Sequence, residues 1–111
     1  MGEPGFLVAD IEDGVAGYVV ADSVPNHGRP LGHVKDIAVH PDRRDEGLGT
    51  KLLRRVLGVL DAEGVASVKL EVRDSNDGAM ELYRDFGFVH RRTIPRYYDN
   101  GDDALVMVAD L

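Results

Sequence analysis

The sequence contains no cysteine. The chain therefore forms no disulfide, no thiolate metal site and no cysteine nucleophile, and this usage is typical of proteins in a reducing compartment. Long apolar runs are also absent, because no stretch approaches the roughly 20 apolar residues that a membrane span needs. Residues 1–4 lack the charged-then-apolar order of a secretory signal. We therefore expect a cytoplasmic protein that does not bind a membrane.

Basic residues are scarce relative to acidic ones. Thirteen lysines and arginines stand against 20 aspartates and glutamates, which gives a net charge of −7, and only 3 of the basic residues are lysine. Such a chain repels nucleic-acid phosphates and anionic membranes, so we expect neither as the main partner. The acidic excess is spread along the whole chain. It fits either a surface adapted to high salt or simply an acidic, solvated surface.

The chain has the length of a single domain, residues 1–111. The first third of the sequence predicts β structure. Two valine-rich runs, Phe6–Ile11 and Val15–Ala21, flank Asp13-Gly14, which is a strong hairpin signal. Prolines, glycines and an asparagine predict a loop over Ser23–Gly32.

A strand, a helix and a second strand follow in the middle of the chain. The first strand is predicted at Val34–Val39 and the second at Val65–Val72. Between them, apolar residues recur at helical spacing from Thr50, and Gly64 stands where a helix terminator is expected. Because strand–helix–strand crossovers are almost always right-handed, the two strands should be parallel.

The last third predicts a short helix and an antiparallel strand pair. Asn76 and its neighbours offer an N-cap, and the apolar stripe of the helix consists of Met80, Leu82, Tyr83 and Phe86. The strand pair is predicted at Phe88–Tyr98 and Ala104–Val108. Together these elements indicate one α+β domain.

Two segments carry candidate chemistry. Glycines in the turn Arg43–Thr50, just before the long helix, let backbone N–H groups approach a phosphate at the helix N-terminus. A turn of the same composition without a ligand is the alternative. On the strand Val65–Val72, a charged face with Lys69 and Glu71 suggests an open cleft, or a solvated face where these two side chains pair.

The motifs then allow a family comparison. Ile37-Ala38-Val39-His40-Pro41 followed by Arg44-x-x-Gly47-x-Gly49 resembles the acetyl-CoA motif of the GNAT acetyltransferase superfamily. The resemblance to RimI-type and archaeal N-terminal acetyltransferases continues through Leu70-Glu71-Val72-Arg73, Ser75-Asn76, Ala79-Met80-Glu81-Leu82-Tyr83, Gly87-Phe88, Arg96-Tyr97-Tyr98, Asp103-Ala104-Leu105 and Met107. It covers nearly the whole chain from Phe6 onward.

The resemblance implies the GNAT fold, a mixed, mostly antiparallel sheet with flanking helices and a central parallel strand pair that splays apart. It also implies residue roles. The backbone of Ile37, Ala38 and Val39 would bind the pantetheine arm of acetyl-CoA. The amides of seven residues would hold its diphosphate: Arg44, Asp45, Glu46, Gly47, Leu48, Gly49 and Thr50.

The remaining roles implied by the resemblance concern the reaction itself. Glu71 matches the general base, acting through water. Asn76 matches the family position near the cofactor, and Tyr83 matches the tyrosine near the thioester sulfur, so Tyr83 would contact the cofactor as well as take part in the reaction. Tyr97 and Tyr98, expected on the late strand, and Arg73 would bind the substrate. No metal is required, and the four histidines show no paired ligand spacing.

The implied activity is acetyl transfer to a protein N-terminus by direct attack in a ternary complex. An α-amine, with a pKa of about 7.7 to 8.0, loses its proton far more easily than a lysine at about 10.4. Two alternatives remain open: a GNAT enzyme acting on lysine or a small amine, and a non-catalytic acyl-CoA-binding module.

The sequence departs from the family in two places. Asp45 and Glu46 put carboxylates beside the proposed diphosphate site, where relatives often have glycine or a basic residue. In addition, GNAT domains usually begin with a strand and one or two helices before the hairpin that here starts at Phe6. Without those helices a second copy of the chain could cover the exposed sheet edge, so a homodimer is one expectation and a truncated fragment is the other.

Overall fold

A computed structural model describes residues 5–11, 15–24, 28–39 and 47–111, and every structural statement refers to these ranges. The predicted hairpin is confirmed, since β1 (Gly5–Ile11) pairs antiparallel with β2 (Val15–Val24). Its turn lies outside the described residues. β3 (Leu31–Val39) pairs antiparallel with β2.

The loop predicted over Ser23–Gly32 is too long. Ser23 pairs with Gly32 and Val24 with Leu31, so both strands run into the predicted loop. The two strands continue their ladder because neighbouring antiparallel residues keep exchanging backbone hydrogen bonds. Turn-forming residues in the sequence therefore marked the connection but not its limits.

The long helix, α1 (Leu48–Ala62), begins two residues before the predicted start. Its buried face has helical spacing and consists of Leu48, Leu52, Leu53, Val56 and Leu60. It ends before Gly64, whose φ of +86° is a left-handed conformation that glycine adopts without strain. β4 (Ser67–Arg73) follows and is parallel to β3, as predicted.

The second helix, α2 (Asp77–Asp85), also confirms the sequence pattern. The side chain of Asn76 accepts a hydrogen bond from the backbone N–H of Ala79 at 3.2 Å, which caps the helix. Met80 and Tyr83 are buried, and Leu82 and Phe86 pack against the same core. The capping residue and the apolar stripe thus fix where α2 starts and which face it buries.

The last strand pair is shorter than predicted. β5 (Val89–Ile94) and β6 (Ala104–Asp110) are antiparallel, but β5 ends before Pro95. Proline lacks the N–H that the ladder needs, and Arg96 has a left-handed φ of 51°. The prediction that Tyr97 and Tyr98 lie on a strand is therefore wrong, because both lie in the β5–β6 loop.

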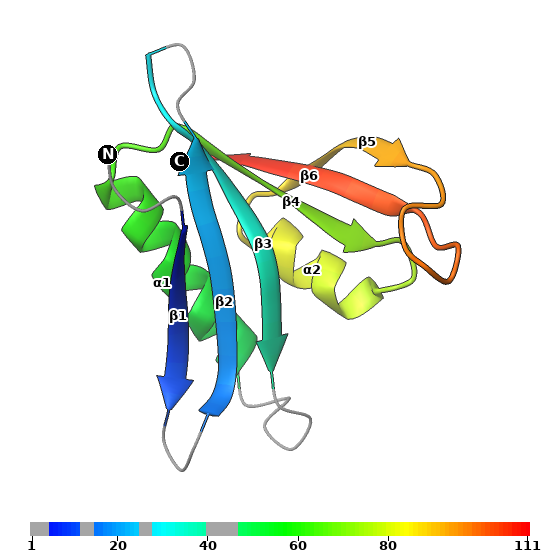
Figure 1. The fold of residues 1–111 in the computed structure, drawn as a ribbon, viewed down its shortest axis with the longest axis horizontal. Coiled ribbons are helices and arrows are strands. Elements are labelled where there is room, and N and C mark those ends of the chain that lie inside the picture. The colour runs from blue at the N-terminus through cyan, green and yellow to red at the C-terminus, as the bar shows by residue number, and fades with distance from the viewer. Residues whose placement is uncertain (1–4, 12–14, 25–27, 40–46) are drawn as a thin grey trace.

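The sheet has the order β1-β2-β3-β4-β6-β5, and only β3 and β4 are parallel (Figure 1). Side chains of both helices and of one sheet face form a single core, in which Leu53, Val56 and Val68 are fully buried. The predicted mixed, mostly antiparallel α+β fold is confirmed. No helix in the described ranges is long and apolar enough to span a bilayer. The homodimer stays a prediction.

The parallel strand pair splays apart as predicted. Leu31–Val34 lie opposite Ser67–Leu70, but beyond these residues β3 stays paired with β2 and β4 with β6. Lys35 is an extra residue in β3 relative to β2, which is a bulge, and bulges increase local twist. Figure 1 shows the two strands starting side by side and then diverging.

Candidate active site

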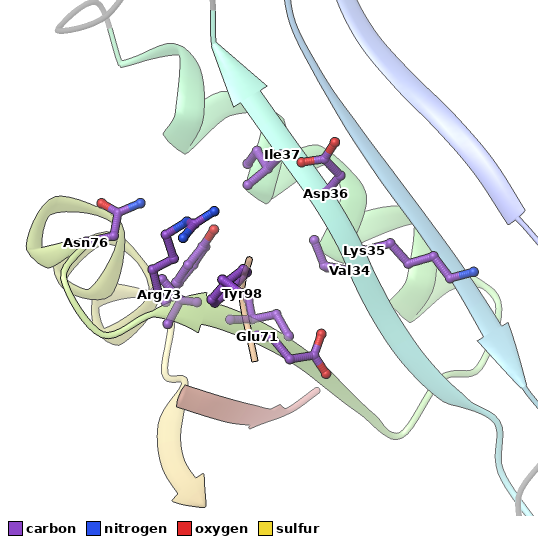
Figure 2. Close-up of a pocket in the computed structure, with 11 residues that line it drawn as sticks. Val34, Lys35, Asp36, Ile37, Glu71, Arg73, Asn76 and Tyr98 are labelled. Carbon is purple, nitrogen blue, oxygen red and sulfur yellow. The ribbon is translucent and has the colours of Figure 1, made fainter. Parts of the chain in front are cut away.

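A cavity of about 230 Å³ occupies the space between the diverging strands (Figure 2). Its lining residues are Val34, Lys35, Asp36 and Ile37 from β3, Leu70, Glu71, Val72 and Arg73 from β4, Asn76 and Tyr83 from the α2 region, and Tyr98 from the β5–β6 loop. The cavity thus brings together six residues that the sequence singled out, from four separate segments.

Glu71 is the carboxylate on the β4 wall, on the face opposite the helices. Its side chain is 15% exposed, and Oε1 lies 2.8 Å from Nε2 of His33 on β3. Its other oxygen lies 3.9 Å from Nζ of Lys69, which is the pair that the sequence offered as an alternative. Figure 2 shows the carboxylate turned away from Arg73. The geometry leaves Glu71 in the cavity with both a histidine and a lysine beside it.

His33 is a site residue that sequence reasoning missed. The spacing between Glu71 and His33 carries no motif, because the contact depends on the register between two parallel strands joined by a helix. The available signal was weaker: a lone histidine placed just before a strand that was expected to line the cleft.

Tyr83 is buried at 5% exposure, and its ring packs 5.9 Å from that of Phe88. Burial raises the pKa of Tyr83 to about 12, and the nearby Tyr98 and Asp36 add to the rise. The phenol therefore keeps its proton throughout the physiological range. A neutral hydroxyl at this place is able to donate a proton to a leaving group.

Tyr98 lies across the cavity mouth, in the β5–β6 loop. Burial raises the pKa of Tyr98, the Arg73 guanidinium opposes that rise, and Tyr97 and Glu71 increase it, so the net shift is upward. Tyr97 contacts Tyr98 edge-on at 5.0 Å between ring centroids but is 51% exposed and does not line the cavity. The two predicted substrate tyrosines thus differ in position.

Asp36 places a second carboxylate on the opposite wall. Tyr18 on β2 donates its hydroxyl hydrogen bond to Oδ2 of Asp36 at 3.0 Å, and this contact raises the pKa of Tyr18. The cavity therefore holds carboxylates on both walls, and its lining also includes the cations Lys35 and Arg73.

The proposed acetyl-CoA residues fall into three groups. Ile37, Ala38 and Val39 lie in β3 beyond its pairing with β4, so among the described residues no strand pairs with backbone groups on that side of β3. Gly47–Thr50 form the start of α1, where Gly47 has a φ of 73° and no side chain of the described part of the chain caps the helix. Arg44, Asp45 and Glu46 lie outside the described residues. The free N–H groups at the helix start fit an anionic ligand such as a diphosphate.

Comparison with known proteins links this geometry to a family. The sequence model of the acetyltransferase (GNAT) family matches residues 1–88. An N-alpha-acetyltransferase of Sulfolobus acidocaldarius is 37% identical, over 96% of this chain and 68% of its own length.

Two solved structures have the same fold. The ribosomal-protein-S18-alanine N-acetyltransferase of Escherichia coli superposes with a TM-score of 0.87 at 31% identity, covering 99% of this chain and 71% of that one. The NatC complex bound to Gag peptide and CoA gives 0.88 at 25% identity, covering 98% and 72%.

Proposed function

The chain belongs to the acetyltransferase (GNAT) family, and we propose that it transfers an acetyl group from acetyl-CoA to the N-terminal α-amine of a protein. One observation carries the proposal: the cavity between β3 and β4 holds Glu71 on one side and the buried, protonated Tyr83 on another. These are the base and the acid that acyl transfer to an amine needs. The relatives named for N-terminal acetylation support the choice of acceptor.

Acetyl-CoA fits the site as a co-substrate. The unpaired edge of β3 at Ile37–Val39 offers N–H and C=O groups to the amides of the pantetheine arm. The free N–H groups of Gly47–Thr50 would hold the diphosphate, with the helix dipole adding roughly 0.3 to 1 kcal/mol. Asn76 and Tyr83 line the cavity between these contacts and Glu71. This arrangement would leave the thioester facing the cavity.

The reaction then needs three proton transfers. Glu71 removes a proton from the α-ammonium through a water molecule, and His33, 2.8 Å away, orients the carboxylate. The neutral amine attacks the carbonyl carbon, the C–S bond breaks, and Tyr83 gives its proton to the thiolate of CoA. The acetylated nitrogen then loses its second proton through water to the Tyr83 phenolate, which restores the phenol, and Glu71 releases its proton to solvent. The products are the acetylated N-terminus and free CoA, with no covalent enzyme intermediate.

The choice of an α-amine over lysine follows from proton chemistry. The two pKa values differ by about 2.5 units, which corresponds to roughly 3.4 kcal/mol in the cost of forming the neutral amine. A single carboxylate acting through water supplies a gain of about 10² to 10⁴. Glu71 is therefore adequate for an α-amine, whereas a lysine would require a further device to lower its pKa.

The proposed acceptor also suggests where the enzyme works. Ribosomes release new N-termini in the cytoplasm, so we place the activity there. We further propose that the acidic surface, with a net charge of −7, is an adaptation to a salty interior.

The first test incubates a mixed peptide library, with free and blocked N-termini, with the chain and acetyl-CoA, and scores by mass spectrometry which nitrogen gains the acetyl group. We expect the α-nitrogen of free N-termini. Glu71→Gln should lower kcat about 10²-fold or more and leave CoA affinity nearly unchanged. Glu81→Gln, an exposed glutamate on α2, is the matched control. Acetylation of lysine alone, or no turnover with normal CoA binding, would contradict the proposal.

A further inference from the structure

Four side chains tie the β5–β6 loop, residues 95–103, to the end of β4. We call this group the Arg73 clasp, and its members are Arg73, Ser75, Asn100 and Asp102. Nη1 of Arg73 donates to Oδ1 of Asn100 at 2.9 Å and lies 3.5 Å from Oδ2 of Asp102. The same Asp102 oxygen accepts from Nδ2 of Asn100 at 3.0 Å and from Oγ of Ser75 at 3.3 Å.

The clasp also holds Tyr98, the aromatic residue at the cavity mouth. The Arg73 guanidinium carbon lies 4.1 Å from the centroid of the Tyr98 ring, which is a cation–π contact. The backbone N–H groups of Tyr97 and Tyr98 both donate to the carbonyl oxygen of Asp102, at 3.0 and 3.1 Å. Asp102 therefore fixes the loop through its backbone while its side chain binds Arg73.

The resemblance to N-terminal acetyltransferases would make Arg73 a direct substrate contact, but its surroundings favour another role. One face of its guanidinium covers an aromatic ring, and a donor is occupied by Asn100. Figure 2 shows the Arg73 side chain running alongside Tyr98. A side chain engaged in this way is suited to hold a neighbour in place.

We propose that the Arg73 clasp positions Tyr98 at the cavity mouth. Asn100 and Asp102 then determine how tightly the acceptor peptide binds, although neither side chain touches it. Arg73 is then a positioning residue, and the loop is a preformed wall of the site. The effect on the acceptor rests on the proposed function, whereas the effect on Tyr98 rests on the contacts alone.

The test combines amide hydrogen exchange with steady-state kinetics on the full chain. Asn100→Ala and Asp102→Ala should speed exchange at the Tyr97 and Tyr98 amides about tenfold, because the loop loses its side-chain hydrogen bonds to Arg73. They should raise the peptide KM about tenfold, while kcat changes less than threefold and the Kd of acetyl-CoA holds. Asp99→Ala, an exposed carboxylate of the same loop outside the clasp, should change none of these.

Amide exchange and the peptide KM together distinguish a positioning role from direct contact with the acceptor. A higher peptide KM with unchanged exchange at Tyr97 and Tyr98 would mean that the side chains contact the acceptor directly, and it would overturn the proposal. Unchanged exchange and unchanged KM would overturn it as well. If the parent chain acetylates no peptide, the proposed function fails, yet faster exchange in Asn100→Ala would still support the clasp and unchanged exchange would refute it.

Loss of folding is detected in the same experiment. Exchange at the core amides of β4, such as Val68 and Leu70, reports on the whole domain. If an alanine variant loses protection there, Arg73→Lys decides the question, because lysine keeps the charge but lacks the planar group that covers Tyr98. Faster exchange confined to the loop in that variant supports the clasp, and parent-like exchange overturns it.

Discussion

At the residue scale, the two proposed catalytic groups occupy opposite environments in one cavity. Glu71 has His33 and Lys69 beside it, since its carboxylate oxygens lie 2.8 Å from Nε2 of His33 and 3.9 Å from Nζ of Lys69. Tyr83 is buried, with Asp36 near enough to disfavour a phenolate. Burial thus keeps Tyr83 protonated for its step, and Glu71 is a carboxylate that lines the same cavity.

Replacing Tyr83 with phenylalanine should lower kcat about 10²-fold and leave acetyl-CoA affinity within about threefold, because the ring remains and only the proton donor is lost. Steady-state kinetics and calorimetry measure the two quantities. An unchanged kcat would remove Tyr83 from the reaction and leave water as the proton donor to the thiolate.

The same tyrosine makes a separate prediction about stability. A tyrosine with a pKa near 10 ionises when unfolded, whereas folded Tyr83 stays protonated up to about pH 12. The contribution of Tyr83 to the free energy of unfolding is therefore complete below pH 10. It is lost as the pH rises from 10 to 12, by an amount on the order of 2 to 3 kcal/mol. Denaturant unfolding of the parent and Tyr83→Phe at pH 8 to 11.5 measures this. Equal alkaline losses in both proteins would contradict it.

Sequence reasoning identified Glu71, its neighbour Lys69 and Tyr83, but not His33 or Tyr18. Glu71 and Tyr83 lie in local sequence motifs. The alternating burial along β4 could be predicted because successive side chains of a strand point to opposite faces of the sheet. The roles of His33 and Tyr18 could not be predicted from local sequence. Each contacts the site across strand pairs, and the bulge at Lys35 shifts which residues of β3 face which side.

At the scale of elements, the site depends on where β3 and β4 separate. Gly32 lies opposite Val68 in the short parallel segment just before the strands part. A Cβ at Gly32 would lie 3.2 or 3.3 Å from three buried side chains, those of Leu60, Val65 and Val68. The absence of a side chain there lets the end of α1 and both strands meet closely, which anchors the closed end of the cleft.

Gly32→Ala should therefore destabilise the fold by about 1 to 3 kcal/mol, because the core has to give way to the added methyl. Gly58→Ala is the matched control. Gly58 is exposed within α1 with no atom near a built Cβ, so alanine there should stabilise by roughly 0.5 to 1 kcal/mol. Denaturant unfolding measures both changes in stability. An unchanged stability in Gly32→Ala would show that α1, β3 and β4 can move apart at this point without cost.

Elements were predicted well where a pattern is local, and less well where a limit depends on pairing. The face of α1 and the cap of α2 follow from spacing and from Asn76. The end of β5 was predicted wrongly, because the predicted strand ran through Pro95 to Tyr98 whereas β5 ends at Ile94. In the structure, proline ended the ladder and the loop then bonded to Asp102.

At the scale of the whole molecule, a net charge of −7 acts on an anionic co-substrate. The long-range repulsion between the chain and CoA is screened by salt, since the Debye length falls from about 10 Å at 0.1 M to about 3 Å at 1 M. The proposed N–H contacts at the start of α1 act within hydrogen-bond distance and should survive that screening. Salt should therefore remove more repulsion than attraction.

We accordingly expect the affinity for acetyl-CoA to hold or rise between 0.1 and 1 M KCl, as measured by calorimetry. The double variant Asp45→Asn with Glu46→Gln removes two carboxylates next to the proposed diphosphate site, so it should bind more tightly at 0.1 M and respond less to KCl. A tenfold loss of affinity in the parent chain at 1 M would mean that attraction between opposite charges, and not backbone hydrogen bonding, dominates binding. Such a loss would also count against adaptation of the acidic surface to salt.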